Sequence, residues 1–271
     1  MTDRTLPLGR KTAYPNKYQP DLLFPIARSE SRASYLSGEL PFDGADIWNA
    51  WELTWLKPGG LPVVATAEII IPADSPNLIE SKSLKLYLNS FAMSHFDDAR
   101  EVRRRLSEDL GSRVGSDISV QIQMLEETEA NAVATLPGLC LDSKPATPTN
   151  WKADATLLAI DADTNVEEEL HSHLLRSLCP VTGQPDIGSI AIHYCGPRID
   201  HTSLLHYIVS FREHNDFHEA CIERMFVDIL ERCQAEKLSI CARYLRRGGI
   251  DINPTRSNFG QAARNLRLWR Q

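Results

Sequence analysis

A thiol and a carboxyl group stand close together in a short segment that is rich in turn-forming residues. Residues 178–186 carry Cys179 and, seven positions later, Asp186, separated by prolines, a threonine, a glycine and a glutamine. A thiolate that attacks an electrophilic carbon and a carboxyl group that moves a proton are the minimum equipment for covalent catalysis. The turn formers predict that both side chains lie on a rigid loop rather than on a helix.

The bulk composition indicates a soluble globular protein with a core of one large or two ordinary domains. The chain has 271 residues, of which 42% are apolar and 24% are charged, and its net charge is −7. That negative charge argues against extensive contact with a nucleic-acid backbone. We expect no contact with a membrane, because no apolar run approaches the roughly 20 residues that cross a bilayer. The polar N-terminus lacks the apolar core of a signal peptide, so we expect a cytoplasmic protein.

The cysteine spacing predicts free thiols and no metal site. None of the six cysteines forms a pair separated by two residues, and their spacing does not suggest a zinc site. Five of them lie among apolar or helix-like neighbours, where a cysteine packs as a small buried hydrophobe. Only Cys179 heads a loop. The other five are Cys140, Cys195, Cys221, Cys233 and Cys241.

The chain contains a weak internal repeat. Residues 83–91 align with residues 203–211, with Ser, Leu, Tyr, Ser and Phe recurring in place. We predict a strand for each apolar-rich copy, followed by a helix over residues 96–110 in the first copy and 217–230 in the second. A chance match is the alternative. If the repeat is a duplication, the copies have specialised, because two aspartates stand in the first where His218 and Glu219 stand in the second.

The repeat predicts two tandem modules. The first occupies residues 1–140 and the second residues 155–271, and residues 141–154 between them are rich in proline and hydroxyl side chains, as a linker would be. Strands outnumber helices, so we expect an α+β fold of antiparallel sheets with a helical layer. Further strands are predicted over residues 63–71, 118–124, 155–160, 189–194 and 239–244.

Four segments together resemble one enzyme family, the 7-cyano-7-deazaguanine reductases, which are the nitrile reductases of queuosine biosynthesis. They are residues 80–87, 179–186, 217–219 and 246–254, in the order typical of the long, two-module form. The resemblance extends from about Tyr18 to Arg256. It implies two tandem tunnelling-fold (T-fold) modules, as in GTP cyclohydrolase I, each an antiparallel sheet with helices layered on one face. It also implies a homodimer.

The resemblance further implies NADPH-dependent reduction of 7-cyano-7-deazaguanine to 7-aminomethyl-7-deazaguanine, and roles for the two reactive residues. Cys179 would be the nucleophile that forms a covalent thioimide with the nitrile, since a thiolate suits this modest electrophile. Asp186 would supply a proton to the nitrogen. Either desolvation raises its pKa, or it takes the thiol proton and passes it on. The alternative for Asp186 is a turn carboxylate that binds backbone amides.

Other residues are candidates for binding. A carboxylate such as Glu219 can accept two hydrogen bonds from the N–H edge of a guanine-like base. Alternatively, Asp216 or His218 caps a helix and Glu219 lies favourably at its positive end; both interpretations can hold. The expected substrate contacts are therefore His218 and Glu219, and the resemblance implies further contacts from Ile79, Glu80 and Ser81.

A dinucleotide would have to be held without a Rossmann site, because no Gly-x-Gly-x-x-Gly pattern follows a strand. Basic side chains and adjacent glycines could receive its phosphates, and a 2′-phosphate would favour NADPH. The alternative for Lys82 and Lys85 is a solvated strand face. The expected cofactor contacts are Ser81, Lys82, Arg247 and Gly248.

Two other functions fit parts of the pattern. One is a pterin- or GTP-processing enzyme of the same fold, but zinc-dependent cyclohydrolases need a ligand set that this chain does not offer at suitable spacing. The other is a non-catalytic purine- or RNA-binding module, from which Cys179 or Asp186 would be expected to be missing.

Overall fold

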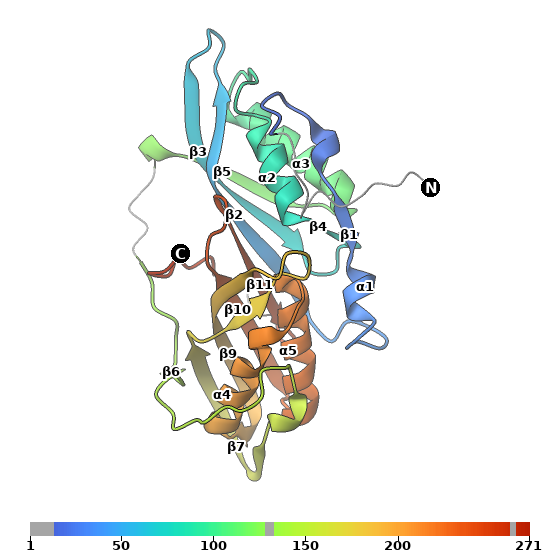
Figure 1. Cartoon of the computed structure of the whole chain (residues 1–271), viewed down its shortest axis with the longest axis vertical. Coiled ribbons are helices and arrows are strands. Elements are labelled where there is room, and N and C mark those ends of the chain that lie inside the picture. The colour runs from blue at the N-terminus through green and yellow to red at the C-terminus, as the bar shows by residue number, and fades with distance from the viewer. Residues whose placement is uncertain (1–13, 128–132, 261–263) are drawn as a thin grey trace. The chain divides into compact units, whose positions relative to one another are not determined.

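Residues 14–127, 133–260 and 264–271 of the computed structural model are described here, and they form a mixed α and β structure (Figure 1). Its strands pair mainly antiparallel, which confirms the predicted α+β class. Contacts divide the chain into two compact units. Unit 1 comprises Met1–Ser29, Ile47–Asn131 and Arg246–Asp251, and unit 2 comprises Glu30–Asp46, Ala132–Leu245 and Ile252–Gln271. The units interleave along the chain, and the division into two modules around residues 141–154 stays a prediction.

Within its described residues, unit 1 contains a two-stranded sheet, part of a larger, mainly antiparallel sheet, and the helices α2 and α3. Strand β1 pairs antiparallel with β4, and β3 pairs antiparallel with β5. Alternate side chains of β3 are buried, as expected for a strand with one face against the core. One stripe of α3 is buried too: Val102, Leu106, Leu110 and Val114. The elements are η1 (Pro20–Leu22), β1 (Pro25–Ala27), β3 (Pro62–Pro72), β4 (Asn77–Ile79), α2 (Ser81–Asn89), α3 (Ala99–Val114), β5 (Ser119–Met124) and η2 (Leu125–Glu127).

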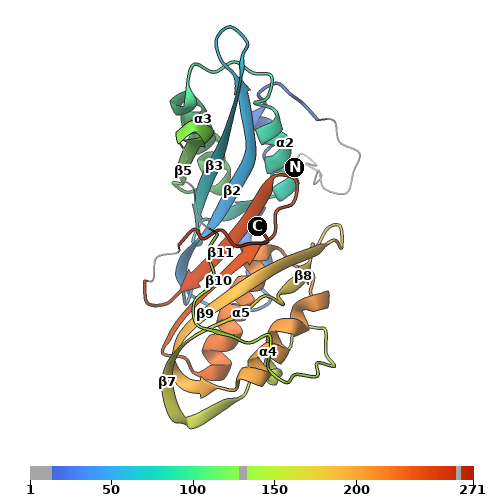
Figure 2. The same cartoon turned by 90° about the vertical axis from the view of Figure 1, so that its left-hand side faces the viewer.

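Unit 2 is built on a sheet in the order β11-β10-β9-β7-β6, to which β8 adds beside β9. Its strands are antiparallel except that β6 runs parallel to β7. Helix α5 packs against β9 and β10 on one face, and Figure 2 views the sheet from its other side. The elements are β6 (Leu139–Cys140), η3 (Ala155–Leu157), β7 (Ile160–Ser172), β8 (Arg176–Leu178), β9 (Pro185–Ile199), α4 (His201–Ser210), η4 (Phe211–Glu213), α5 (His218–Cys233), β10 (Lys237–Tyr244) and β11 (Ile250–Ser257).

Two further elements have residues in both units. They are α1 (Arg28–Arg32) and β2 (Asp43–Leu56), and β11 also begins in unit 1 and continues in unit 2. The predicted strands over residues 63–71, 118–124, 189–194 and 239–244 are confirmed, as are the helices that follow the repeats. The predicted strand over residues 155–160 is wrong, because that segment forms the short helix η3 before β7 begins.

The strand prediction for the repeated segments is also wrong, because residues 83–91 and 203–211 lie in helices α2 and α4. Their short apolar runs fit either element, and an acidic residue three positions before each segment favours the helix. The Glu80 carboxylate accepts the backbone N–H groups of Lys82 and Ser83, and the Asp200 carboxylate accepts that of Ser203. Each carboxylate caps a helix N-terminus and satisfies amides that would otherwise lack a partner.

The two copies of the repeat make the same contacts. The Tyr87 hydroxyl donates to Asp109 on α3 at 2.6 Å, and the Tyr207 hydroxyl donates to Asp228 on α5 at 2.7 Å. Each tyrosine also packs edge-on against the phenylalanine four residues later, at 5.1 Å and 5.4 Å between ring centres. The repeated residues therefore make equivalent contacts in the two copies, which favours a duplication over a chance match.

A buried cluster of charges anchors α5 within unit 2. The guanidinium of Arg256 lies 2.7 Å from Glu223 and 2.8 Å from Asp46, and all three side chains are almost fully buried. Arg32 binds both carboxylate oxygens of Glu223, each at 2.8 Å. Burial alone would raise the pKa of Glu223, but the two arginines outweigh it and hold that pKa at about 2.

Replacing Arg256 by methionine is expected to destabilise the protein strongly. The change would leave Asp46 without its arginine in a buried site, at a cost of about 3–5 kcal/mol in the free energy of unfolding. Urea unfolding followed by circular dichroism measures it. The matched control is Arg104→Met, which removes an exposed pair with Glu108 and should cost less than about 0.5 kcal/mol. Equal losses of unfolding free energy in the two variants would mean that the buried cluster stabilises the protein no more than an exposed ion pair does.

Candidate active site

The predicted nucleophile directly follows β8, at the start of the turn that joins β8 to β9 in unit 2. The N–H of Cys179 donates to the carbonyl of Gln184 at 2.8 Å, and the N–H of Gly183 donates to the carbonyl of Cys179 at 2.9 Å. Gly183 has a φ of +66°, a left-handed conformation that glycine adopts without strain. The loop between them is exposed, whereas Cys179 is only 8% exposed. The turn therefore fixes the cysteine at its base.

Asp186 is the second residue of β9, so the prediction that it lies on the loop is wrong. It pairs with Ser177 of β8, and Cys179 comes two residues after Ser177. The bond from the Cys179 N–H to Gln184 continues this register one step past the end of β8, so Cys179 and Asp186 project to the same side of the hairpin. Such diagonal neighbours lie roughly 7–8 Å apart, close enough for one small substrate group to touch both.

The segment before α5 is bound to the same hairpin. The N–H of Leu178 donates to the carbonyl of His214 at 2.8 Å, and the N–H of Asp216 donates to the carbonyl of Leu178 at 3.2 Å. This places the first residue of α5 beside the hairpin: His218 Nε2 lies 3.7 Å from Oδ1 of Asp186. The structure thus brings together the cysteine loop and the later His-Glu motif, two segments that are distant in the sequence.

Glu219 is buried in the first turn of α5, where its negative charge faces the positive end of the helix dipole. The alternative in which Asp216 or His218 caps the helix is wrong. The N-cap is Phe217, which makes no side-chain capping bond, and the Asp216 carboxylate accepts the N–H of Phe217 instead. Glu219 is 2% exposed and is therefore a buried acid rather than a solvated one.

Two residues that the motifs did not single out also belong to this cluster. The ring of Tyr244, the last residue of β10, packs edge-on against His218 with 4.1 Å between ring centres. Burial raises the pKa of its phenol, and Asp186 and Glu219 add to the effect. Ser177 is the buried register partner of Asp186. No local pattern marks either residue, because strand pairing across the sheet brings them here.

The remaining predicted contacts lie in unit 1. Ile79 ends β4, Glu80 caps α2, and Ser81 and Lys82 begin that helix. Glu80 is fully buried, and burial raises its pKa although the two capping amides lower it. Its capping bonds use one acceptor position on each carboxylate oxygen, so further acceptor capacity remains for a ligand.

A cavity of about 310 Å³ in unit 1 joins the start of α2 to the segment around Gly248. Lys82 and Lys85 line it and bring positive charge, and Glu52 is the one carboxylate among the described lining residues. Lys82 and Lys85 lie half-buried in a helix, which corrects the alternative of a solvated strand face. Gly248 has a φ of +59°, and its backbone forms part of the lining, from which Arg247 and Ser81 are absent.

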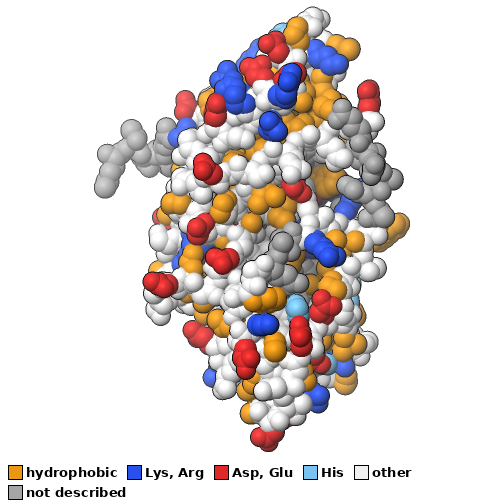
Figure 3. Space-filling model, turned by 180° about the vertical axis from the view of Figure 1, so that it is seen from behind, with side chains coloured by type: hydrophobic (Ala, Val, Ile, Leu, Met, Phe, Trp, Pro, Cys, Tyr) orange, Lys and Arg blue, Asp and Glu red, His pale blue; other side chains and the backbone are white. Residues whose placement is uncertain are grey.

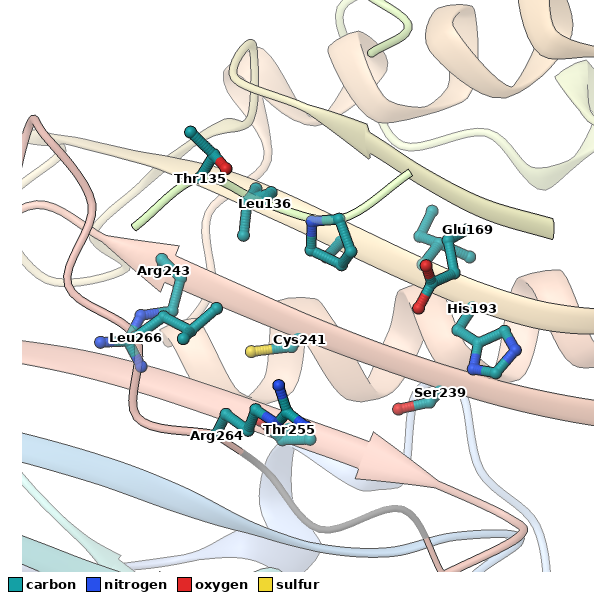
Figure 4. Close-up of a pocket in the computed structure, with 13 residues that line it drawn as sticks. Thr135, Leu136, Glu169, His193, Ser239, Cys241, Arg243, Thr255, Arg264 and Leu266 are labelled. Atoms are coloured by element: carbon teal, nitrogen blue, oxygen red, sulfur yellow. The ribbon is translucent and has the colours of Figure 1, made fainter. Parts of the chain in front are cut away.

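A second cavity, of about 630 Å³, lies on the face of the unit 2 sheet opposite α5 (Figure 4). Side chains from β9 and β10 line it, including His193 and Cys241, and Arg243 and Arg264 add positive charge. The four predicted catalytic and substrate-binding residues of unit 2 are not among the lining residues. Size alone therefore does not identify the reactive site.

The comparisons with known proteins agree with the four sequence segments. A family model described as "Nitrile reductase, 7-cyano-7-deazaguanine-reductase N-term" matches residues 14–122, and one described as "QueF-like protein" matches residues 185–262. A curated protein of Azoarcus sp. (strain BH72), named NADPH-dependent 7-cyano-7-deazaguanine reductase, is 51% identical over 254 residues, which cover 93% of this chain and 90% of the relative.

Among the described residues, no helix combines the length and apolarity needed to cross a membrane. The resemblance read from the sequence motifs is confirmed by the relative and by both family models. The chain belongs to the family of 7-cyano-7-deazaguanine reductases, the nitrile reductases.

Proposed function

We propose that the protein reduces the nitrile of 7-cyano-7-deazaguanine to the amine of 7-aminomethyl-7-deazaguanine, with NADPH as reductant, in the biosynthesis of queuosine in tRNA. The observation that carries the proposal is Cys179 and Asp186 on one face of a hairpin, in a chain that is 51% identical to a reductase of that name. His218 and Glu219 lie at the adjoining helix N-terminus.

The first step is addition of the Cys179 sulfur to the nitrile carbon. The C–S bond forms as one π bond of the nitrile breaks, and the nitrogen takes up a proton to give a covalent thioimide. The thiol proton balances this step, so the adduct has the combined mass of protein and ligand. We assign delivery of that proton to Asp186, either as a neutral acid or as a relay from the thiol.

His218 and Glu219 orient the substrate for this attack. Glu219 accepts hydrogen bonds from the N–H edge of the base, and its burial makes such charge-assisted bonds strong. His218 is 3.7 Å from Asp186 and is itself held by Tyr244. In unit 1, Ile79, Glu80 and Ser81 are proposed to contact the substrate as well.

The cavity beside α2 offers two lysines and a glycine backbone to the phosphates of a dinucleotide, and Glu52 is the carboxylate that also lines it. We assign Lys82 and Gly248 to NADPH, with Ser81 and Arg247 as neighbouring contacts. Conversion of a nitrile to an amine takes four electrons, so two molecules of NADPH, bound in turn, would each supply one hydride for each nitrile. Exclusion of water between the two deliveries would protect the intermediate from hydrolysis.

We also propose a more specific fold than the α+β class, namely two tandem T-fold modules. The recurring cap, tyrosine and phenylalanine contacts of α2 and α4 support two tandem T-fold modules, over residues 1–140 and 155–271 with a linker over 141–154.

We propose a homodimer that acts on a small molecule. On the face shown in Figure 3, acidic and basic side chains are interspersed, whereas a nucleic-acid backbone is bound by contiguous positive charge.

Intact-protein mass spectrometry tests the proposal. Mixing the protein with 7-cyano-7-deazaguanine in the absence of NADPH should add the mass of one whole ligand, and later addition of NADPH should remove the adduct as the amine forms. Binding without an adduct would favour a non-catalytic purine-binding module. Neither binding nor adduct would show that the substrate is wrong.

Replacing Glu219 by glutamine is expected to weaken binding of the deazaguanine by about 10- to 100-fold, because charge-assisted bonds are lost at a buried position. Binding of NADPH should change by less than about threefold. Calorimetry with each ligand separates the two effects. Glu231→Gln, at an exposed position of the same helix, is the control and should change neither affinity. Equal losses for both ligands in Glu219→Gln would indicate a structural role.

A further inference from the structure

A cysteine and two histidines gather at the edge of the unit 2 sheet. One possible ligand atom from each of Cys140, His171 and His173 lies within 4.8 Å of the others. Pairing of β6 with β7 sets Cys140 beside His171, and His173 follows two residues later. The imidazole rings of the two histidines are 5.3 Å apart. The sequence predicted no metal site because Cys140 is remote from the histidines along the chain, and the strand register removes that separation.

The hydrogen bonds of His171 leave one ring nitrogen able to bind a metal. Its Nδ1 lies 2.8 Å from the carbonyl oxygen of Pro137. A carbonyl can only accept, so Nδ1 carries the proton and the lone pair of the neutral ring is on Nε2. Histidines that bind metals are typically held in this way, by a backbone carbonyl at the other nitrogen.

His173 is oriented by a comparable bond. Its Nδ1 lies 2.8 Å from the hydroxyl oxygen of Ser189, which also receives Arg270 at 3.3 Å. The backbone N–H of His173 donates to the Asp142 carboxylate, which in turn accepts the hydroxyl of Ser172. These contacts tie the end of β7 to the residues that follow Cys140, so the three donors are held close together before any ion binds.

We propose that Cys140, His171 and His173 form a binding site for one zinc ion. One thiolate and two imidazoles form a soft-to-borderline ligand set that suits Zn²⁺ far better than Mg²⁺ or Ca²⁺. Bonds of about 2.0–2.3 Å at tetrahedral angles separate donor atoms by about 3.3–3.8 Å. Small side-chain rotations would close the cluster to that spacing. Three protein ligands leave a fourth position for water, and the ion would tie β6 to β7.

None of the three proposed zinc ligands is a proposed catalytic residue, so the test of the zinc site does not depend on the reductase activity. The full chain is reduced, freed of metal with a chelator and titrated with Co²⁺, whose tetrahedral thiolate complexes absorb strongly. We expect one equivalent to give a sulfur-to-cobalt charge-transfer band that Zn²⁺ abolishes by displacement. Cys140→Ser should lose the band and bind at least about 100-fold more weakly.

Two controls make the result specific. Cys195→Ser, which changes another half-buried cysteine of the same sheet, and Cys179→Ala, which changes the proposed nucleophile, should both keep the band and its stoichiometry. If Cys140→Ser does not fold, His173→Ala at a half-buried position replaces it. A band that persists in Cys140→Ser, an unchanged Co²⁺ affinity in His173→Ala, or wild-type protein that binds no Co²⁺ at micromolar concentrations would overturn the proposal.

Protection of the thiol supplies an independent measurement. Zn²⁺ should slow alkylation of Cys140 by iodoacetamide at least about tenfold, as measured by peptide mass spectrometry, because a metal-bound thiolate is a weaker and less accessible nucleophile. Alkylation of Cys195 in the same sample should be unchanged. Equal rates at Cys140 with and without Zn²⁺ would contradict the assignment.

Discussion

Replacing Cys179 by alanine is expected to abolish both the covalent adduct and NADPH oxidation. Alanine cannot bond to the nitrile carbon, and loss of a nucleophile that forms an obligatory covalent intermediate typically lowers turnover by more than about a thousandfold. The measurement is the intact mass of the variant after incubation with 7-cyano-7-deazaguanine, together with the decrease of NADPH absorbance. Binding of the ligand, followed by calorimetry, should persist because the base is held elsewhere.

The control must separate chemistry from folding. The Cys179 backbone closes the hairpin through its N–H and carbonyl, and alanine keeps both groups. The free energy of unfolding should therefore change by less than about 1 kcal/mol. Cys195→Ala tests another cysteine of the same unit and should retain full activity. An adduct that survives in Cys179→Ala would assign the nucleophile to another residue.

Replacing Asp186 by asparagine is expected to slow thioimide formation by about 100- to 10,000-fold. Asparagine has nearly the same shape but cannot pass a proton to the nitrile nitrogen, and general acid catalysis contributes on this scale. Asp186 is only 4% exposed, so solvent cannot readily take over its role. Rapid mixing of excess protein with the ligand, stopped in acid and weighed by mass spectrometry, measures this single step.

The same variant also distinguishes a catalytic carboxylate from a structural one. If Asp186 only supported the hairpin, Asp186→Asn would lower stability and leave the rate of the folded protein near normal. Asp163→Asn, at an exposed position of β7, is the matched change and should alter neither quantity. A near-normal single-turnover rate in Asp186→Asn would remove this residue from the mechanism.

Local sequence patterns were sufficient to identify the candidate catalytic segments and to predict several of the helices and strands. The four motifs are contiguous segments, so they could be recognised without knowing how the chain folds, and the matching relative agrees with them. The helices α3 and α5 were predictable because their apolar residues recur at helical spacing. The repeated segments were recognised as equivalent but assigned to strands, because a short apolar run does not by itself distinguish the two elements.

Only the tertiary structure decided which segments meet. The register of β8 on β9 turns Asp186 toward the side of Cys179, and the bonds of Leu178 to the chain before α5 bring His218 to them. The register of β10 adds Tyr244, and that of β6 adds Cys140 to two histidines. Strand pairing depends on partners far along the chain, so a local window reveals which residues can do chemistry but not which of them share a site.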